Sequence, residues 1–316
     1  MKKYSIMICT YNGEAYLDKV IESIYSQKNI DSLIEKVLIV DNASHDKTKD
    51  IIMRYMEKYK NLNYIYEKNP GLANARKHIV SIDTEWCILL DDDNILLENF
   101  IMNLDNFIQS NPNLGVVNSN SIAYPDFNVT QKESDLIRAL LSSLACTHYC
   151  IDEVKSHKAA LNCPFGAGMT IRVGPIKKYA EQQWLVNTGR KQGSLTSGED
   201  GELARIVLKE GYIHKLNKES SFYHIIPKFR IQPQYVKKLK KGLVEGSYVF
   251  ISTDNKYIIK RLKMLVRKIF NIILFPIRYL KAKEKYKKIY LKLTLIDAFN
   301  MIGYILKDFI VIRKFD

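Results

Sequence analysis

Short apolar runs alternate with amphipathic stretches along the first 120 residues of the chain. The runs are continuously apolar, as strands are when helices cover both faces of a sheet. They predict strands at Tyr4–Cys9, Lys36–Val40, Leu62–Tyr66, Trp86–Leu90 and Leu114–Val117. Helical spacing of the apolar residues between them predicts helices at Glu14–Gln27, Asp46–Lys58, Leu72–Ser81 and Leu97–Ser110. This alternation predicts an α/β fold built from βαβ units around a mostly parallel sheet.

The pattern changes in the second half of the chain. Residues 124–162 show no clear chemistry, and two short strands are predicted further on, at Tyr212–Leu216 and Ser221–Ile225. Beyond Pro227 the chain becomes basic, with apolar residues at helical spacing. We therefore expect an α/β region over residues 1–228 and a basic amphipathic helical region over residues 229–316.

Charge is divided unevenly between these two regions. The 316 residues carry a net charge of +14, yet residues 226–316 hold 22 Lys and Arg against 6 Asp and Glu. The C-terminal region is therefore strongly basic and the rest is close to neutral. The five scattered cysteines are expected to be free thiols, as in a reducing compartment, and the first apolar run is too short for a signal peptide. A cytoplasmic protein is expected.

Polar residues follow three of the predicted strands, at the point where each strand ends. These are Thr10-Tyr11-Asn12, Asp41-Asn42 and Asp91-Asp92-Asp93. In an open α/β sheet the carboxyl ends of the strands border the ligand-binding crevice. We expect the three groups to converge on one site.

The carboxylate triplet at residues 91–93 has two interpretations. Three adjacent like charges are costly unless a cation balances them, and carboxylate oxygens suit Mg²⁺ or Mn²⁺. Alternatively, the triplet is a solvated turn at the start of the next helix, where Asp and Asn are favoured.

Other candidates each have a functional and a structural interpretation. Asp41 could bind a base or ribose, or cap the following helix. The turn at Gly71 leads into a helix start where Arg76 could bind a diphosphate, or could be a surface arginine. Glu199 and Asp200 could supply a general base, or could stabilise a helix N-terminus.

His224 follows an apolar aromatic run. It could be a metal ligand or a buried histidine with its hydrogen bonds satisfied. The residues themselves favour the buried interpretation.

Together these segments resemble, in order and spacing, the family 2 glycosyltransferases. The resemblance covers residues 4–230 and rests on six motifs: Thr10-Tyr11-Asn12, Val40-Asp41-Asn42-Ala43-Ser44, Gly71-Leu72-Ala73 with Ala75-Arg76, Leu90-Asp91-Asp92-Asp93-Asn94, Gly166-Ala167-Gly168-Met169 and Gly198-Glu199-Asp200.

The resemblance implies a GT-A fold, a Rossmann-like catalytic domain over residues 1–228. Residues 1–120 would bind the nucleotide sugar and residues 121–228 the acceptor. The nucleotide-sugar contacts would come from Thr10, Tyr11, Asn12, Asp41, Asn42, Gly71, Arg76, Asp91 and Asp92.

For the metal the resemblance implies Asp93 and Asp91, holding Mn²⁺ or Mg²⁺. An alternative register, Asp92 with Asn94, stays open, and His224 is a further candidate ligand because a histidine near the diphosphate occurs in similar proteins. Asp200, beside Glu199, would be the general base that deprotonates the acceptor.

The implied reaction is an inverting transfer of a sugar from a nucleotide diphosphate, UDP in the first instance, to a glycan or lipid-linked acceptor of a cell-surface polysaccharide. Two other classes of protein fit the sequence less well. A sugar-phosphate nucleotidyltransferase would need a glycine-rich basic loop, whereas residues 10–14 hold one glycine and no lysine. A nucleic-acid-binding protein would use the basic region, which lacks a helix-turn-helix or zinc pattern, so no nucleic acid partner is expected.

The basic C-terminal region also has two compatible interpretations. Its apolar stretches are interrupted by charges and fall short of a membrane span. Basic amphipathic helices could lie on an anionic membrane surface, which would make the protein peripheral at the inner face of the cell membrane. They could also pack on the catalytic domain.

Overall fold

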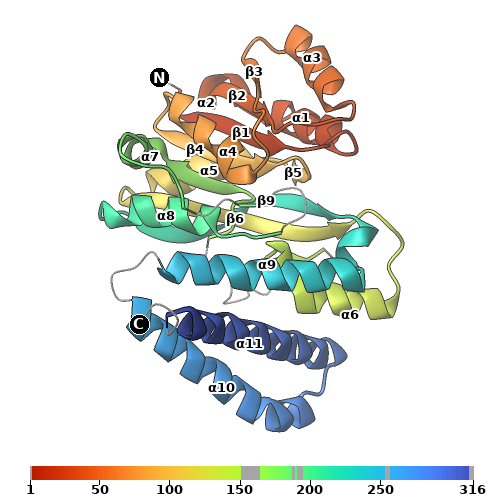
Figure 1. Ribbon diagram of the computed structural model, residues 1–316. Helices are drawn as coiled ribbons and strands as arrows, with labels where there is room; N and C mark the ends of the chain where they lie inside the picture. Colours follow the sequence, from red (N-terminus) through yellow and green to blue (C-terminus); the bar gives the residue numbers. More distant parts are fainter. Residues whose placement is uncertain (1, 151–163, 187–188, 191–194, 253–256, 313–316) are drawn as a thin grey trace.

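The computed structural model describes all residues except 1, 151–163, 187–188, 191–194, 253–256 and 313–316. A curled sheet forms its centre, with strands in the order β3-β2-β1-β4-β8-β6-β9-β5 and β7 paired with β6. Helices flank the sheet, and a layer of long C-terminal helices lies beyond its lower edge (Figure 1). The predicted mixed α/β architecture is confirmed.

The first part of the sheet is parallel and closely follows the predicted strands. It comprises β1 (Tyr4–Thr10), β2 (Ile34–Asp41), β3 (Leu62–Tyr66) and β4 (Trp86–Asp91). Side chains alternate between the two faces, so that Ile6 and Ile8 enter one core cluster and Met7 the other. Both faces are buried, which explains why the strands are continuously apolar.

Helices cover each face of this parallel part. One core cluster holds residues of α1 (Leu17–Tyr25), α2 (Ile30–Leu33), α3 (Thr48–Lys58) and α5 (Phe100–Gln109). The opposite cluster holds residues of α4 (Leu72–Arg76), the 3₁₀ helix η1 (Lys77–Ser81), α7 (Val173–Ala180) and α8 (Glu199–Lys209). The predicted helix over residues 72–81 is thus an α-helical turn continued as a 3₁₀ helix.

The second part of the sheet corrects the sequence predictions. The two strands predicted at 212–216 and 221–225 belong to one long strand, β9 (Ile213–Ile226). The strand predicted at 114–117 continues as β6 (Leu114–Pro125). The short strands β5 (Asn94–Leu96), β7 (His148–Tyr149) and β8 (Met169–Arg172) were not predicted. β8 is antiparallel to β4 and β6, whereas β9 is parallel to β6 and antiparallel to β5.

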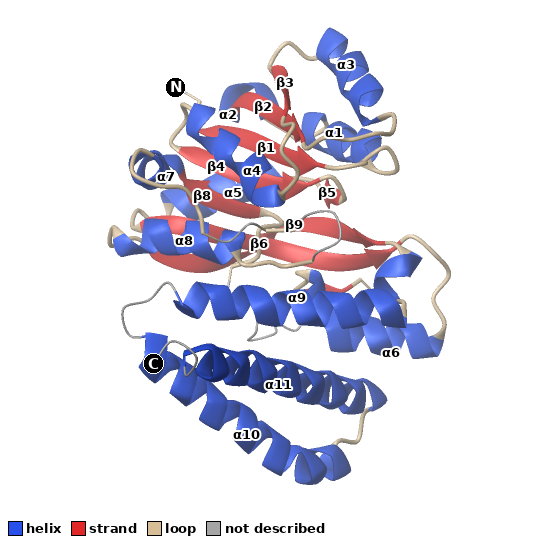
Figure 2. Cartoon of the chain, in the orientation of Figure 1, coloured by secondary structure: helices blue, strands red, loops and turns tan. Residues whose placement is uncertain are grey.

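The basic region is helical, as predicted. It consists of η4 (Lys228–Ile231), α9 (Pro233–Ser252), α10 (Tyr257–Lys281) and α11 (Lys285–Ile312). α11 contacts α9, α10 and α6 (Gln131–Leu140), so these helices form a layer below the sheet (Figure 2). None of the helices, where the structure describes them, combines the length and the apolar character needed to cross a membrane.

Candidate active site

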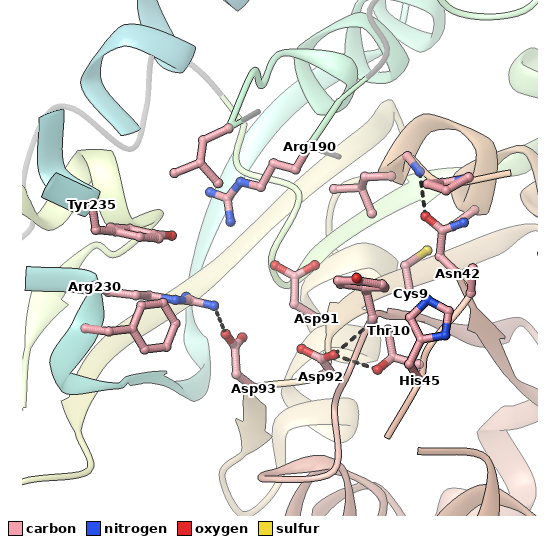
Figure 3. A pocket seen from close by; sticks show the side chains of 18 residues that line it. Cys9, Thr10, Asn42, His45, Asp91, Asp92, Asp93, Arg190, Arg230 and Tyr235 are labelled. Atoms are coloured by element: carbon pink, nitrogen blue, oxygen red, sulfur yellow. Dashed lines mark hydrogen bonds and ion pairs between the residues drawn. The ribbon is translucent and has the colours of Figure 1, made fainter. Parts of the chain in front are cut away.

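A cavity of about 360 Å³ opens at the carboxyl ends of β1, β2 and β4 (Figure 3). All three polar strand ends contribute to it: Thr10 and Tyr11 from β1, Asn42 from β2 and the acidic triplet from β4. Its other walls carry Cys9, Ala43, His45, Pro70, Gly71, Leu72, Ala75, Arg190, Leu195, Phe229, Arg230 and Tyr235.

Asp91, Asp93 and His224 form a cluster with the donor set of a cation site. One ligand atom of each lies within 4.8 Å of the others. The sheet creates this proximity, because Asn94 of β5 pairs with His224 of β9. The Asn94 side chain accepts from the Asp91 amide at 3.0 Å and donates to Asp93 Oδ1 at 2.9 Å. Asn94 therefore stabilises the acidic turn formed by residues 91–93. Because its side chain is already bonded within this turn, the geometry favours Asp91 with Asp93 as ligands over the alternative of Asp92 with Asn94.

Two carboxylates and one imidazole fit a divalent cation such as Mg²⁺ or Mn²⁺. In the structure the guanidinium of Arg230 contacts two of these groups, Asp93 and His224. Arg230 Nη2 donates to Asp93 Oδ2 at 2.6 Å, and its Nη1 lies 3.1 Å from His224 Nε2. His224 Nε2 is also 3.3 Å from Asp93 Oδ1.

These contacts determine the ionisation of Asp93 and His224. Burial alone would raise the pKa of Asp93, but the charges of Arg230 and His224 hold that pKa well below its usual range. Burial lowers the pKa of His224, yet the Asp93 carboxylate outweighs it and raises the pKa to about 10. The site therefore holds a carboxylate balanced by positive charge.

Asp92 has a different environment from its two neighbours. Its Oδ2 accepts from Thr10 Oγ1 at 2.6 Å and from the Tyr11 amide at 3.4 Å. Burial, followed by the charge of Asp93, raises the pKa of Asp92 to about 7. The hydrogen bonds of this carboxyl connect the acidic turn after β4 to the end of β1, two segments that line the cavity.

The side of the cavity next to β2 is shaped by hydrogen bonds between loops. Asp41 is 1% exposed, and its two oxygens accept from the Ser44 amide at 2.9 Å and from the Tyr64 hydroxyl at 3.1 Å. Asn42 accepts from the Gly71 amide at 2.7 Å, and Asn12 accepts from the amide of His45 at 2.9 Å. Asp41 and Asn12 are absent from the described lining of the cavity and support its wall from behind.

Arg76 lies beneath the cavity, not on its surface. It is 3% exposed, and its Nη1 donates to Glu199 Oε1 at 3.0 Å while its Nη2 lies 4.0 Å from Asp91 Oδ1. A Cβ on Gly166 would stand 2.2 Å from Arg76 Nη2, so only glycine leaves room for this guanidinium. Among the described lining residues, the cations that reach the cavity are instead Arg190 and Arg230.

Glu199 and Asp200 open α8 and point to different partners. Glu199 is 2% exposed, and burial raises its pKa despite the opposing effect of Arg76. Asp200 is half-buried and accepts from the Gly166 amide at 2.8 Å and from the Gly201 amide at 2.8 Å. Neither lines the described cavity, but both adjoin its floor through Arg76 and the 166–169 segment.

Most of the cavity wall opposite β2 was not predicted from the sequence. That wall consists of Arg190, Phe229, Arg230 and Tyr235, from the segment before α8 and from η4 and α9. The resemblance ends at residue 230, and a single arginine among many basic residues gives no signal of its own. The nearest residue that the sequence singled out as a candidate for the site is His224, six residues before Arg230.

The fold and site define a class of protein. Solved structures that match over nearly the whole chain are GT-A glycosyltransferases. A Pyrobaculum calidifontis mannosyltransferase, solved with GDP-mannose and Mn²⁺, has a TM-score of 0.60 at 14% identity and covers 95% of this chain and 87% of its own. Residues 1–349 of S. aureus TarS, solved with UDP, give 0.50 at 15% identity, with 96% and 92% covered. The GT-A fold is therefore confirmed.

The family follows from the sequence comparison. Residues 5–171 match the model of glycosyl transferase family 2, and the chain belongs to that family. The Bacillus subtilis minor teichoic acid biosynthesis protein GgaB is 24% identical over 81% of this chain, and an uncharacterized glycosyltransferase of Mycoplasma genitalium is 30% identical over 34%. The alignments cover 27% and 37% of those proteins. The chain is therefore a member of a glycosyltransferase family, as the resemblance implied.

Proposed function

We propose that this glycosyltransferase moves a sugar from a nucleotide diphosphate, UDP in the first instance, to an acceptor hydroxyl with inversion at the anomeric carbon. The observation that carries the proposal is the cluster of Asp91, Asp93 and His224 on the wall of a cavity bordered by Thr10 and Tyr11. This is the arrangement that a nucleotide and a cation-bound diphosphate require.

Asp91 and Asp93 would hold a divalent cation, and His224 would become a third ligand by losing its proton when the cation takes the place of the Arg230 contact. The cation supplies positive charge where negative charge develops on the departing diphosphate. Arg190 and Arg230 add charge on the same side of the cavity, whereas Arg76 keeps Glu199 and Asp91 in place from below.

Asp200 is the proposed general base. The acceptor oxygen forms a bond to the anomeric carbon as the bond from that carbon to the diphosphate oxygen breaks, and the acceptor proton passes to the Asp200 carboxylate. The Gly166 and Gly201 amides orient this carboxylate. A single displacement needs no covalent enzyme intermediate and inverts the configuration.

The acceptor is proposed to be a glycan or a lipid-linked intermediate of a cell-surface polysaccharide, as the similarity to a teichoic acid biosynthesis protein suggests. A lipid-linked acceptor would place the enzyme at the inner face of the cell membrane. The boundary predicted near residue 228 would then separate most of the catalytic domain from the C-terminal helices, although Phe229, Arg230 and Tyr235 beyond it line the cavity. The later helices α10 and α11 would serve the peripheral location.

The proposal is tested by incubating the purified chain and Mn²⁺ with a panel of UDP-, GDP- and dTDP-sugars and measuring the nucleoside diphosphate released. We expect slow hydrolysis of one donor, abolished by EDTA and restored by Mn²⁺ or Mg²⁺. Equal turnover with and without metal would contradict the role given to the acidic cluster.

Arg230 gives a prediction that does not depend on turnover. Its guanidinium contacts two proposed metal ligands, Asp93 and His224, so the guanidinium and the metal compete for them. In Arg230→Gln we expect a lower melting temperature without metal, because a buried carboxylate loses its partner. We expect Mn²⁺ to bind at least as tightly and to restore the melting temperature. Titration of Mn²⁺, followed by electron paramagnetic resonance, measures the affinity. A variant that binds Mn²⁺ more weakly than the wild type would contradict this competition.

A further inference from the structure

An exposed apolar stripe runs along the whole described length of α10. Val266 is 66% exposed, Ile273 63% and Leu280 82%. At 100° per residue these side chains and their exposed neighbours fall within an arc of roughly 100°, one continuous helix face. The stripe consists of Leu262, Val266, Ile269, Phe270, Ile273, Ile277 and Leu280.

The stripe is not the face that holds α10 on the protein. Met264 and Leu265, on the other side of the helix, pack against a cluster formed by Val244 of α9 and Met301 of α11. α10 is also the outermost helix of the C-terminal layer, with α11 between it and α9 (Figure 1). The stripe therefore points away from the core, and its exposure is not explained by packing within the chain.

Charge identifies the surface that the stripe fits. Residues 257–281 contain seven Lys and Arg and no Asp or Glu. Lys263, Arg267, Arg278 and Lys281 are exposed, and on the helical wheel they border one side of the apolar arc. An apolar face edged by cations is the pattern of a helix lying in the interface of an anionic bilayer.

We propose that α10 docks the protein on an anionic lipid surface, with the stripe inserted at the boundary between headgroups and acyl chains. A second copy of the chain fits less well, because pairing two such faces would bring two sets of cations together without acidic partners. The inference deepens the proposed peripheral location. Vesicle binding is measured without turnover, so its failure is distinguishable from failure of the transferase assignment.

The test uses the full chain and sedimentation with vesicles of phosphatidylcholine alone or mixed with phosphatidylglycerol. The stripe variant carries Val266→Ser, Ile273→Ser and Leu280→Ser. A matched control carries Val80→Ser, Leu208→Ser and Ile213→Ser, which are exposed apolar residues of the catalytic domain. We expect the wild type and the control to bind anionic vesicles, and the stripe variant to bind at least about tenfold more weakly, because each serine removes apolar area from the interface.

Charge is tested separately with Arg267→Gln and Arg278→Gln. Each lost cation is expected to weaken binding to anionic vesicles about fivefold. Unchanged melting temperatures and unchanged donor hydrolysis would show that every variant is folded. Three results would overturn the proposal: undiminished binding of the stripe variant, equal binding to neutral vesicles, or a dimer in solution without lipid that the stripe substitutions abolish.

Discussion

Asp93→Asn is expected to lower metal-dependent donor hydrolysis by at least about 100-fold, since loss of groups that merely support metal ligands already costs 10- to 100-fold in affinity or activity. The substitution keeps the shape of the side chain but removes the charge that faces Arg230 and His224. We also expect a lower melting temperature, because Arg230 and His224 would lose the carboxylate between them. Hydrolysis rates over a range of Mn²⁺ concentrations measure the first effect, and thermal unfolding measures the second.

Asp92→Asn is the matched control, with the same chemical change one residue away. Its carboxyl is bonded to Thr10 and the Tyr11 amide and is not part of the cluster with His224. Asn can still accept from Thr10, so we expect a smaller loss of activity and an unaltered Mn²⁺ dependence. If Asp92→Asn abolished the metal response and Asp93→Asn did not, the assignment of ligands would shift by one residue.

The parallel half of the fold was predictable because its sequence and its burial agree. β1 to β4 have helices on both faces, so most positions are apolar and each strand is recognisable in the sequence. β6 was harder to predict because its polar residues are buried, and β9 because buried and exposed polar residues interrupt its apolar pattern. Asn118 and Ser119 are at most 2% exposed, and Asn118 Oδ1 accepts from His214 Nε2 at 2.9 Å. Such cross-strand pairs satisfy polar groups inside a sheet, and a hydropathy pattern does not reveal them.

The site was predictable to the extent that it lies at strand ends. The carboxyl ends of β1, β2 and β4 must meet at one edge of a parallel sheet, and the cavity forms there. The far wall depends on how η4 and α9 fold back, which local sequence does not specify. The same limit applies to Arg76: its helix start was recognisable, but burial beneath Gly166 depends on a segment 90 residues further along the chain.

Asp200→Asn separates the two adjacent carboxylates of α8. An amide can still accept from the Gly166 amide but cannot take a proton from the acceptor, so we expect the kcat of sugar transfer to fall by about 10²- to 10⁴-fold. The KM for the donor should change little and the melting temperature should fall only slightly, because Asp200 is half-buried and the asparagine oxygen can keep one of the two bonds from the Gly166 and Gly201 amides. Steady-state kinetics with the donor found in the panel provide the measurement.

Glu199→Gln is expected to lower the stability of the protein more than its catalytic rate, the reverse of Asp200→Asn. Glu199 and Arg76 are both almost fully buried, and neutralising Glu199 leaves Arg76 with Asp91, 4.0 Å away, as its remaining ion-pair partner, at a cost of up to about 3–5 kcal/mol in the free energy of unfolding. Its main effect is therefore expected in thermal unfolding, with activity lost in proportion to the fraction unfolded. A stable Glu199→Gln enzyme without turnover, beside an active Asp200→Asn enzyme, would move the general base to Glu199. That outcome would require the acceptor to reach a carboxylate that Arg76 now covers.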